Sequence, residues 1–223
     1  MENQLFKYNK RVHLVPLIAI VSIWLVYIFE IKFGYNFNKY GVYPQKLSGL
    51  KGIIFSPFLH SNTKHLINNS VPLAVMLSSL YFFYHQIANK VLFWGVILSG
   101  FLTWVIGRPS YHIGASGVVY FLVSFIFFSG IFRKYYRLVA VSLIVVFLYG
   151  SMVWYIFPVE EQISWEGHLS GFLVGLLIAF FYKNKGPIPK PFEFSENEDF
   201  EKLFDEDGNY SPPKEPVSEE EIE

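Results

Sequence analysis

Residues 114–132 read GASGVVYFLVSFIFFSGIF and contain no charged side chain. A run of this length is close to the ~20 apolar residues that an α-helix needs to cross the hydrocarbon core of a bilayer. Ser116 stands among small residues at the beginning of the run, and a second uncharged stretch begins around His168. A serine and a histidine just inside two membrane-length segments suggest covalent chemistry within the bilayer.

The composition of the whole chain is that of an integral membrane protein. Of the 223 residues, 52% are hydrophobic and 20% are aromatic, and the apolar runs are too long for soluble helices. The zero net charge is the sum of two oppositely charged regions. Residues 1–190 contain 16 Lys and Arg and 5 Asp and Glu, whereas residues 191–223 contain 2 Lys and Arg and 13 Asp and Glu. The chain has no cysteine, which excludes thiol nucleophiles and thiolate metal sites and leaves serine as the candidate nucleophile.

Six apolar segments have a length close to that of a membrane span. The predicted fold class is therefore an all-α polytopic membrane protein with six transmembrane helices. The first segment is too long for a signal-peptide core and lacks a small-residue cleavage site, so we expect it to be retained. The predicted spans are 12–31, 66–87, 91–106, 115–132, 138–157 and 167–182.

Basic residues predict how the helices are oriented, because the cytoplasmic loops of membrane proteins are rich in Lys and Arg. One side of the predicted bundle carries Lys7, Lys10, Arg11, Arg133, Lys134, Arg137, Lys183 and Lys185. Both termini are then cytoplasmic, in what we predict to be a bacterial inner membrane. The long first external loop, about 32–64, contains five lysines and argues mildly against this orientation. Its aromatic and apolar content predicts that it is partly embedded in the membrane.

The chain is predicted to have three parts. Residues 1–11 form a cytoplasmic N-terminal segment, and residues 12–185 form the six-span domain. Residues 186–223 begin with Gly-Pro-Ile-Pro-Lys-Pro and are rich in Glu and Asp. Such a composition cannot bury enough apolar surface to fold alone, so this acidic cytoplasmic tail is predicted to be disordered. A docking segment for an unknown partner is the alternative.

Three polar residues in the spans are predicted to lie at one depth. Counted from the residue that ends each helix on the basic side, Ser116, His168 and Asn69 lie about 25, 22 and 24 Å along their helices, at ~1.5 Å per residue. A bilayer penalises stray polar groups, so this coincidence favours a shared site several Å below the external surface.

Each of these residues also has a structural interpretation. A serine in a membrane helix often packs against its neighbours, a histidine near a helix end can reach the interface, and an asparagine can hydrogen-bond an adjacent helix. The residues around them favour catalysis, because the glycines beside Ser116 allow close backbone approach and Gly171 and Gly175 form a GxxxG spacing after His168. Closely packed helices would bring a serine hydroxyl within reach of an imidazole.

With these residues in place, the chain resembles the rhomboid family of intramembrane serine proteases. His65-Leu-Ile-Asn-Asn69 is similar to the family's HxxxN element, residues 114–117 to its GxSG element, and His168 with Gly171 and Gly175 to its HxxGxxxG element. The three elements occur in family order over about residues 50–182. The Trp-Arg pair that many members have in the first loop is not apparent near Lys51-Gly52.

The resemblance implies a rhomboid-like bundle with a catalytic dyad and no carboxylate. Ser116 would be the nucleophile and His168 the general base and acid. Asn69, His65 and the Ser116 backbone N–H would stabilise the oxyanion, while the Tyr120 ring would orient His168. The activity implied is that of an intramembrane serine endopeptidase that uses no metal or other cofactor.

The implied substrates are transmembrane proteins that enter sideways from the lipid bilayer; nucleic acid is not an expected partner. A site below the surface can accept only an unwound peptide, so helix-destabilising residues are expected near the outer end of the substrate. Gly114 and Gly117 are the expected substrate-binding positions, and loop 158–165 could act as a cap. His60 and His112 are expected to structure loops, with a direct catalytic role as the alternative. The oligomeric state is left open.

Other function classes fit less well. An inactive rhomboid-like protein that binds or escorts membrane clients is the main alternative, although such proteins typically lack the serine or the histidine. A transporter would be expected to have charged residues in mid-span. A metalloprotease would need an HExxH helix, and an aspartyl intramembrane protease would need an aspartate within a span; the sequence has neither.

Overall fold

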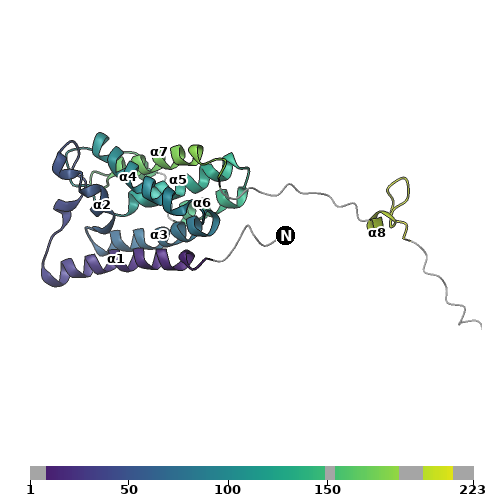
Figure 1. Ribbon diagram of the computed structural model, residues 1–223, viewed down its shortest axis with the longest axis horizontal. Coiled ribbons are helices and arrows are strands. Elements are labelled where there is room, and N and C mark those ends of the chain that lie inside the picture. The colour runs from purple at the N-terminus through teal and green to yellow at the C-terminus, as the bar shows by residue number, and fades with distance from the viewer. Residues whose placement is uncertain (1–8, 149–153, 186–197, 213–223) are drawn as a thin grey trace, which may run out of the picture. The chain divides into compact units, whose positions relative to one another are not determined.

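The computed structural model of the protein describes residues 9–148, 154–185 and 198–212. The chain divides into a unit of residues 1–189 and a unit of residues 190–223, which are treated separately below. Within the described residues the first unit is a bundle of helices without a β-strand, apart from one isolated bridge between Val42 and His112 (Figure 1). The predicted all-α class is therefore confirmed.

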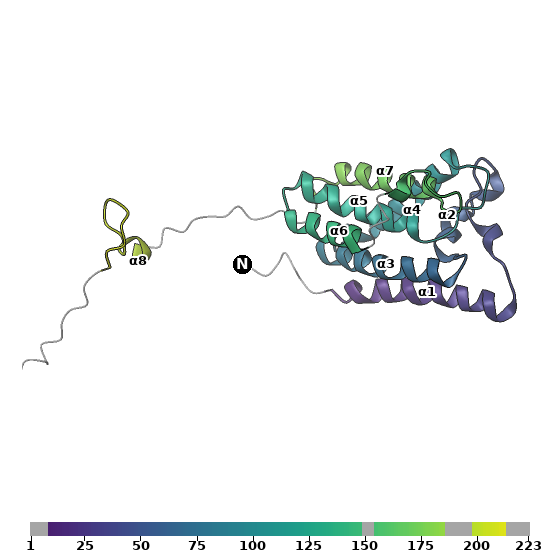
Figure 2. The ribbon, with the colours of Figure 1, turned by 180° about the vertical axis from the view of Figure 1, so that it is seen from behind.

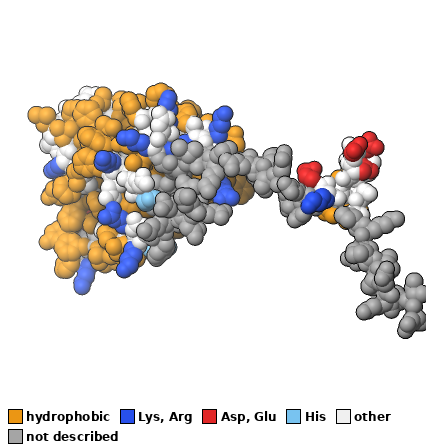
Figure 3. All heavy atoms as spheres, turned by 45° about the vertical axis from the view of Figure 1, so that its right-hand side comes forward, with side chains coloured by type: hydrophobic (Ala, Val, Ile, Leu, Met, Phe, Trp, Pro, Cys, Tyr) orange, Lys and Arg blue, Asp and Glu red, His pale blue; other side chains and the backbone are white. Residues whose placement is uncertain are grey.

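A helix occupies each of the six predicted spans. Three of these helices are long and apolar enough to cross a membrane, namely α1 (Arg11–Phe33), α3 (Thr63–Phe83) and α4 (Ala88–Ile106). The other three are shorter apolar helices, namely α5 (Ser116–Phe132), α6 (Tyr136–Leu148) and α7 (Trp165–Phe181). Hydrophobic side chains cover much of the face of this unit that Figure 3 draws, which is the surface expected of an integral membrane protein.

The predicted boundaries of the spans 66–87 and 138–157 were wrong. The predicted span 66–87 begins earlier, because the Asn62 side chain accepts a hydrogen bond from the backbone N–H of His65 at 2.8 Å and caps α3. It also ends earlier, at Phe83. In the predicted span 138–157, α6 ends at Leu148, residues 149–153 lie outside the described residues, and Trp154–Ile156 is a 3₁₀ turn.

Close contact between α5 and α7 sets the geometry of the bundle. A Cβ atom added to Gly171 would lie 2.2 Å from the backbone oxygen of Gly117, and one added to Gly175 would lie 2.5 Å from that of Phe121. The Ser124 hydroxyl donates to the Phe172 carbonyl at 2.6 Å and joins the two helices. The expected role of the GxxxG spacing in helix packing is confirmed.

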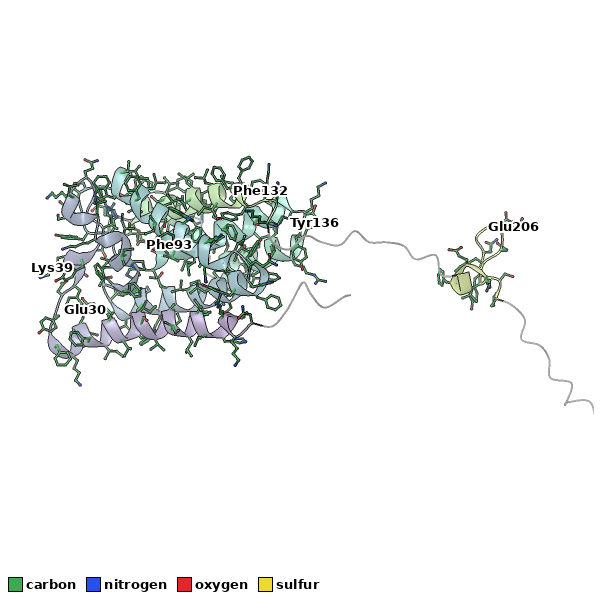
Figure 4. All side chains as sticks on the ribbon, in the orientation of Figure 1. Glu30, Lys39, Phe93, Phe132, Tyr136 and Glu206 are labelled. Carbon is green, nitrogen blue, oxygen red and sulfur yellow. The ribbon has the colours of Figure 1, made fainter. Side chains whose placement is uncertain are left out.

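The connection between α1 and α3, hereafter the first loop, is folded rather than extended. It contains the short helices Asn38–Tyr40, Leu47–Gly49, α2 (Gly52–Phe55) and Ser56–Phe58. Lys39 in this loop and Glu30 on α1 lie at one end of the bundle, and Phe132 and Tyr136 lie at the other (Figure 4). The α2 segment packs against α4, and the two are drawn side by side in both ribbon views (Figures 1 and 2). Partial embedding of the first loop in the membrane stays a prediction.

Arg133 joins three helices at the end of the bundle opposite the first loop. Its guanidinium donates to the Ser129 hydroxyl at 2.9 Å and to the carbonyl oxygens of Tyr182 and Lys185 beyond α7. The Tyr84 hydroxyl, at the end of α3, donates to the same Ser129 oxygen at 2.8 Å. The side chain of Arg133 therefore stabilises the packing of these helices, in addition to marking the basic side of the bundle.

Replacing Arg133 with alanine should destabilise the bundle. Hydrogen bonds to a charged group contribute about 1.5–3 kcal/mol each, so we expect the free energy of unfolding to fall by at least about 2 kcal/mol. Thermal unfolding in detergent would measure this, with Arg137→Ala as the control because Arg137 is exposed on α6. Equal midpoints for the two variants would contradict the assigned role.

The described part of the second unit is residues 198–212. It contains the four-residue helix α8 (Glu198–Glu201) and a turn closed by an isolated bridge between Phe204 and Tyr210. Most of the predicted disordered tail, residues 186–197 and 213–223, lies outside the described residues. The three-part domain division therefore stays a prediction.

Candidate active site

Ser116 is the first residue of α5. Gly114, two residues earlier, has a φ of +111°, which residues with a side chain rarely adopt. This glycine therefore allows the chain to turn into the beginning of α5. The N–H groups in the first turn of a helix have no partner within the helix. The backbone around Ser116 therefore offers donors beside its own hydroxyl.

His168 lies in the first turn of α7 and its side chain is buried. Its Nε2 atom is 2.8 Å from the Ser116 Oγ atom, so the two residues that the sequence placed at one depth are in hydrogen-bond contact. This distance is within the range required of a nucleophile and its general base.

The backbone carbonyl of Tyr155 determines which nitrogen of His168 can act as a base. His168 Nδ1 lies 2.8 Å from this oxygen, which can only accept, so Nδ1 carries the proton and donates it. In the neutral imidazole, Nε2 is then unprotonated and accepts from the Ser116 hydroxyl. The carbonyl thus performs the orienting function that a carboxylate has in a Ser-His-Asp triad.

Tyr120 packs against the other side of the histidine. Its ring is stacked on the imidazole with 4.2 Å between centroids and 13° between planes. Tyr120 lies one turn after Ser116 on α5, so a single helix presents both the nucleophile and the face that holds the base. The stacking that the sequence predicted is present.

His65 and Asn69 lie against the glycine that precedes the nucleophile. A Cβ atom added to Gly114 would be 2.6 Å from His65 Nε2 and 3.5 Å from Asn69 Nδ2. The Asn69 Nδ2 atom is buried and has no hydrogen-bond partner among the described residues. Both side chains therefore offer donors next to Ser116, where the predicted oxyanion would form.

Gly117, the second predicted substrate-binding glycine, faces α7. A Cβ atom there would be 3.4 Å from the backbone oxygen of Gly167, which is an ordinary contact. His60 is a buried residue of the first loop, and its ring lies 5.0 Å from that of His65. Burial together with the neighbouring His65 lowers the pKa of His60 to about 4. A buried neutral ring fits the expected loop-packing role.

A cavity of about 40 Å³ adjoins the serine. Its lining includes Ser116, Thr103, His112 and Ser164, and this volume is enough for at least one water molecule. Among the described residues no three His, Cys, Asp or Glu side chains are grouped so that they could hold a metal ion.

Sequence reasoning missed three contributors around this site. The Tyr155 carbonyl gives no signal in the sequence, because any residue supplies a backbone oxygen. Glu166 and Arg108 form an ion pair with 3.6 Å between Arg108 Nε and Glu166 Oε1. Glu166 had a detectable signal, namely an acidic residue two positions before His168 in an apolar segment, but no role was predicted for it.

Comparison with known proteins shows the family to which the chain belongs. The sequence model of the rhomboid domain matches residues 48–185, and the chain belongs to the rhomboid family. It is 34% identical over 172 residues to an uncharacterized protein of Mycobacterium bovis and to one of Mycobacterium tuberculosis, covering 72% of this chain and 71% of each relative. An uncharacterized protein of Mycobacterium leprae is 31% identical over 170 residues, or 71% of this chain and 66% of the relative.

Proposed function

We propose that this protein is an intramembrane serine endopeptidase with a dyad of Ser116 and His168. The observation that carries the proposal is the 2.8 Å contact between Ser116 Oγ and His168 Nε2, with Nδ1 occupied by the Tyr155 carbonyl. Membership of the rhomboid family supports it, because that family contains intramembrane proteases. An inactive rhomboid-like protein would have no need to keep a serine and an unprotonated imidazole nitrogen in contact.

The arrangement supports acyl transfer in two steps. His168 Nε2 removes the Ser116 proton as Oγ attacks the scissile carbonyl, and the developing oxyanion is stabilised by Asn69, His65 and the Ser116 N–H. The protonated imidazole then gives its proton to the leaving amine. A water molecule, activated by the same nitrogen, hydrolyses the acyl-enzyme.

The positive charge that His168 carries during the reaction has two stabilising contacts. The Tyr155 carbonyl accepts from Nδ1, and the Tyr120 ring lies parallel to the imidazole at 4.2 Å. A cation over an aromatic face is attracted by about 0.5–2 kcal/mol. These contacts favour the imidazolium state without a buried carboxylate.

The substrates are single-span membrane proteins whose outer end unwinds easily, because a helix with all its backbone hydrogen bonds made cannot present a peptide bond to Ser116. They enter from the bilayer, and cleavage takes place near the external boundary. The proposed location is a bacterial inner membrane with both termini in the cytoplasm.

The proposal is tested by reconstitution into liposomes with a single-span substrate that has a helix-destabilising residue near its outer end. The wild type should cleave it, whereas His168→Ala should reduce the rate by at least about 10³-fold, because it removes the base that contacts the serine. A wild type that leaves the substrate intact would favour the inactive, client-binding class.

A further inference from the structure

Glu166 is a buried carboxylate that the reaction does not use. Only 1% of its side chain is exposed, although it lies in the first turn of α7, two residues before His168. Its Oε1 atom accepts from the backbone N–H of Arg108 at 3.2 Å and lies 3.6 Å from Arg108 Nε. A buried charge is costly without a partner, so this pairing indicates a specific role.

Arg108 contacts more than the carboxylate. Its Nη2 atom donates to the carbonyl oxygens of Glu161 and Ile163 at 2.6 Å each. Arg108 follows the end of α4, whereas both carbonyls belong to the loop before α7. One guanidinium therefore joins the segment that leads to Ser116 with the segment that leads to His168.

His112 and Ser164 form a second link between the same two segments. His112 Nε2 lies 3.1 Å from the Arg108 carbonyl, which only accepts, and burial lowers the pKa of this imidazole. In the neutral ring Nε2 therefore carries the proton, and Nδ1 accepts from the Ser164 hydroxyl at 2.5 Å. The backbone of His112 also exchanges two hydrogen bonds with Val42 of the first loop, at 3.0 and 2.8 Å.

These links close around the reacting residues. His112 is four residues before Ser116, and Ser164 is four residues before His168. Ser164 Oγ and the Arg108 contacts thus fix the beginning of α7 relative to the beginning of α5. A shift of about 1 Å between reacting groups can cost about 10²-fold in rate, so the position of these two helix ends matters for catalysis.

We propose that Arg108, His112, Ser164 and Glu166 form a clamp that holds His168 at hydrogen-bond distance from Ser116. The four are positioning residues, and the inference rests on the proposed function. The clamp also limits the expected cap, loop 158–165. Residues 161–164 are held by Arg108 and His112, so any opening for a substrate is confined to residues 158–160.

The kinetic test is Glu166→Gln, which keeps the shape of the side chain and removes its charge. We expect kcat to fall by about 10²-fold while KM stays within about twofold, because Glu166 is buried and does not line the cavity beside Ser116. Ser164→Ala removes only the second link and should reduce kcat less. Glu201→Gln is the control, because Glu201 is an exposed carboxylate in the second unit, outside both the clamp and the proposed opening, and should leave both constants unchanged.

A second measurement does not depend on activity. The chain has no cysteine, so spin labels can be placed on Tyr111→Cys and Gln162→Cys, two exposed positions in the clamped segments. In the wild-type background the distance between the labels should be narrowly distributed, and Glu166→Gln should broaden the distribution. The control variant Glu201→Gln should leave it unchanged.

The outcomes separate the clamp from the proposed function. A broadened distance with a reduced kcat supports the clamp, and an unchanged distance overturns it whatever the kinetics. A broadened distance with an unchanged kcat also overturns it, because His168 would then be positioned without these contacts. If the wild type cleaves nothing, the proposed function fails and the distance measurement alone decides whether the clamp exists.

Discussion

Replacing Ser116 with alanine should abolish the cleavage of membrane substrates while the protein stays folded. Removal of a serine nucleophile lowers kcat by about 10⁶-fold in a serine protease, because the other members of the constellation cannot act without it. The Ser116 hydroxyl contacts His168, and its loss removes one hydrogen bond worth about 1 kcal/mol. We therefore expect a rate below detection with a thermal midpoint close to that of the wild type.

Ser79→Ala is the control for this experiment. Ser79 lies on α3, and within the part of the chain that the structure describes its hydroxyl bonds only to the Val75 carbonyl of its own helix. This variant should cleave at the wild-type rate. Residual cleavage by Ser116→Ala above about one per cent of the wild-type rate would contradict a role for this serine as nucleophile.

Replacing Gly171 with valine should have the largest effect on the fold. The added Cβ atom would lie 2.2 Å from the backbone oxygen of Gly117, and a backbone atom cannot move aside as a flexible side chain can. Helices α5 and α7 must then separate. We expect the free energy of unfolding to fall by at least about 2 kcal/mol. The rate of cleavage per folded molecule should fall by about 10²-fold, because the separation moves His168 away from Ser116.

Gly117→Ala is the control for stability in the same helix pair. Its Cβ atom would lie 3.4 Å from the nearest atom across the interface, so it fits with little adjustment. Alanine also favours the helix over glycine by about 1 kcal/mol. Thermal unfolding in detergent should therefore rank Gly117→Ala at or above the wild type and Gly171→Val well below it. The reverse order would contradict the assigned packing.

The six helices could be predicted from the sequence because long apolar runs in a bilayer must be helical. The family resemblance was predicted separately, from three side-chain motifs. Helix ends were less predictable. The Asn62 cap starts α3 three residues before its apolar run, and residues Trp154–Ile156 form a 3₁₀ turn although the sequence there is still apolar. Hydropathy does not detect where hydrogen bonding stops.

The structure brings together three of the predicted site residues, whose catalytic roles stay predictions. Ser116 and Tyr120 lie one turn apart on α5, and His168 on α7 contacts both. The Tyr155 carbonyl was missed, since backbone groups leave no mark in the sequence. No role was predicted for Arg108 and Glu166, because their pairing depends on where the segment after α4 meets the first turn of α7. The two residues are 58 positions apart in the sequence.

Activation of the Ser116 hydroxyl by His168 can be tested by labelling with a fluorophosphonate probe. Such a probe reacts with activated serines, so the test does not require the natural substrate. The purified protein in detergent would be incubated with the probe, digested and analysed by mass spectrometry to locate the modified residue. We predict that the probe modifies Ser116 in the wild type and that neither Ser116→Ala nor His168→Ala is labelled. Labelling that persists in Ser116→Ala, or that is equally fast in His168→Ala and the wild type, would contradict it.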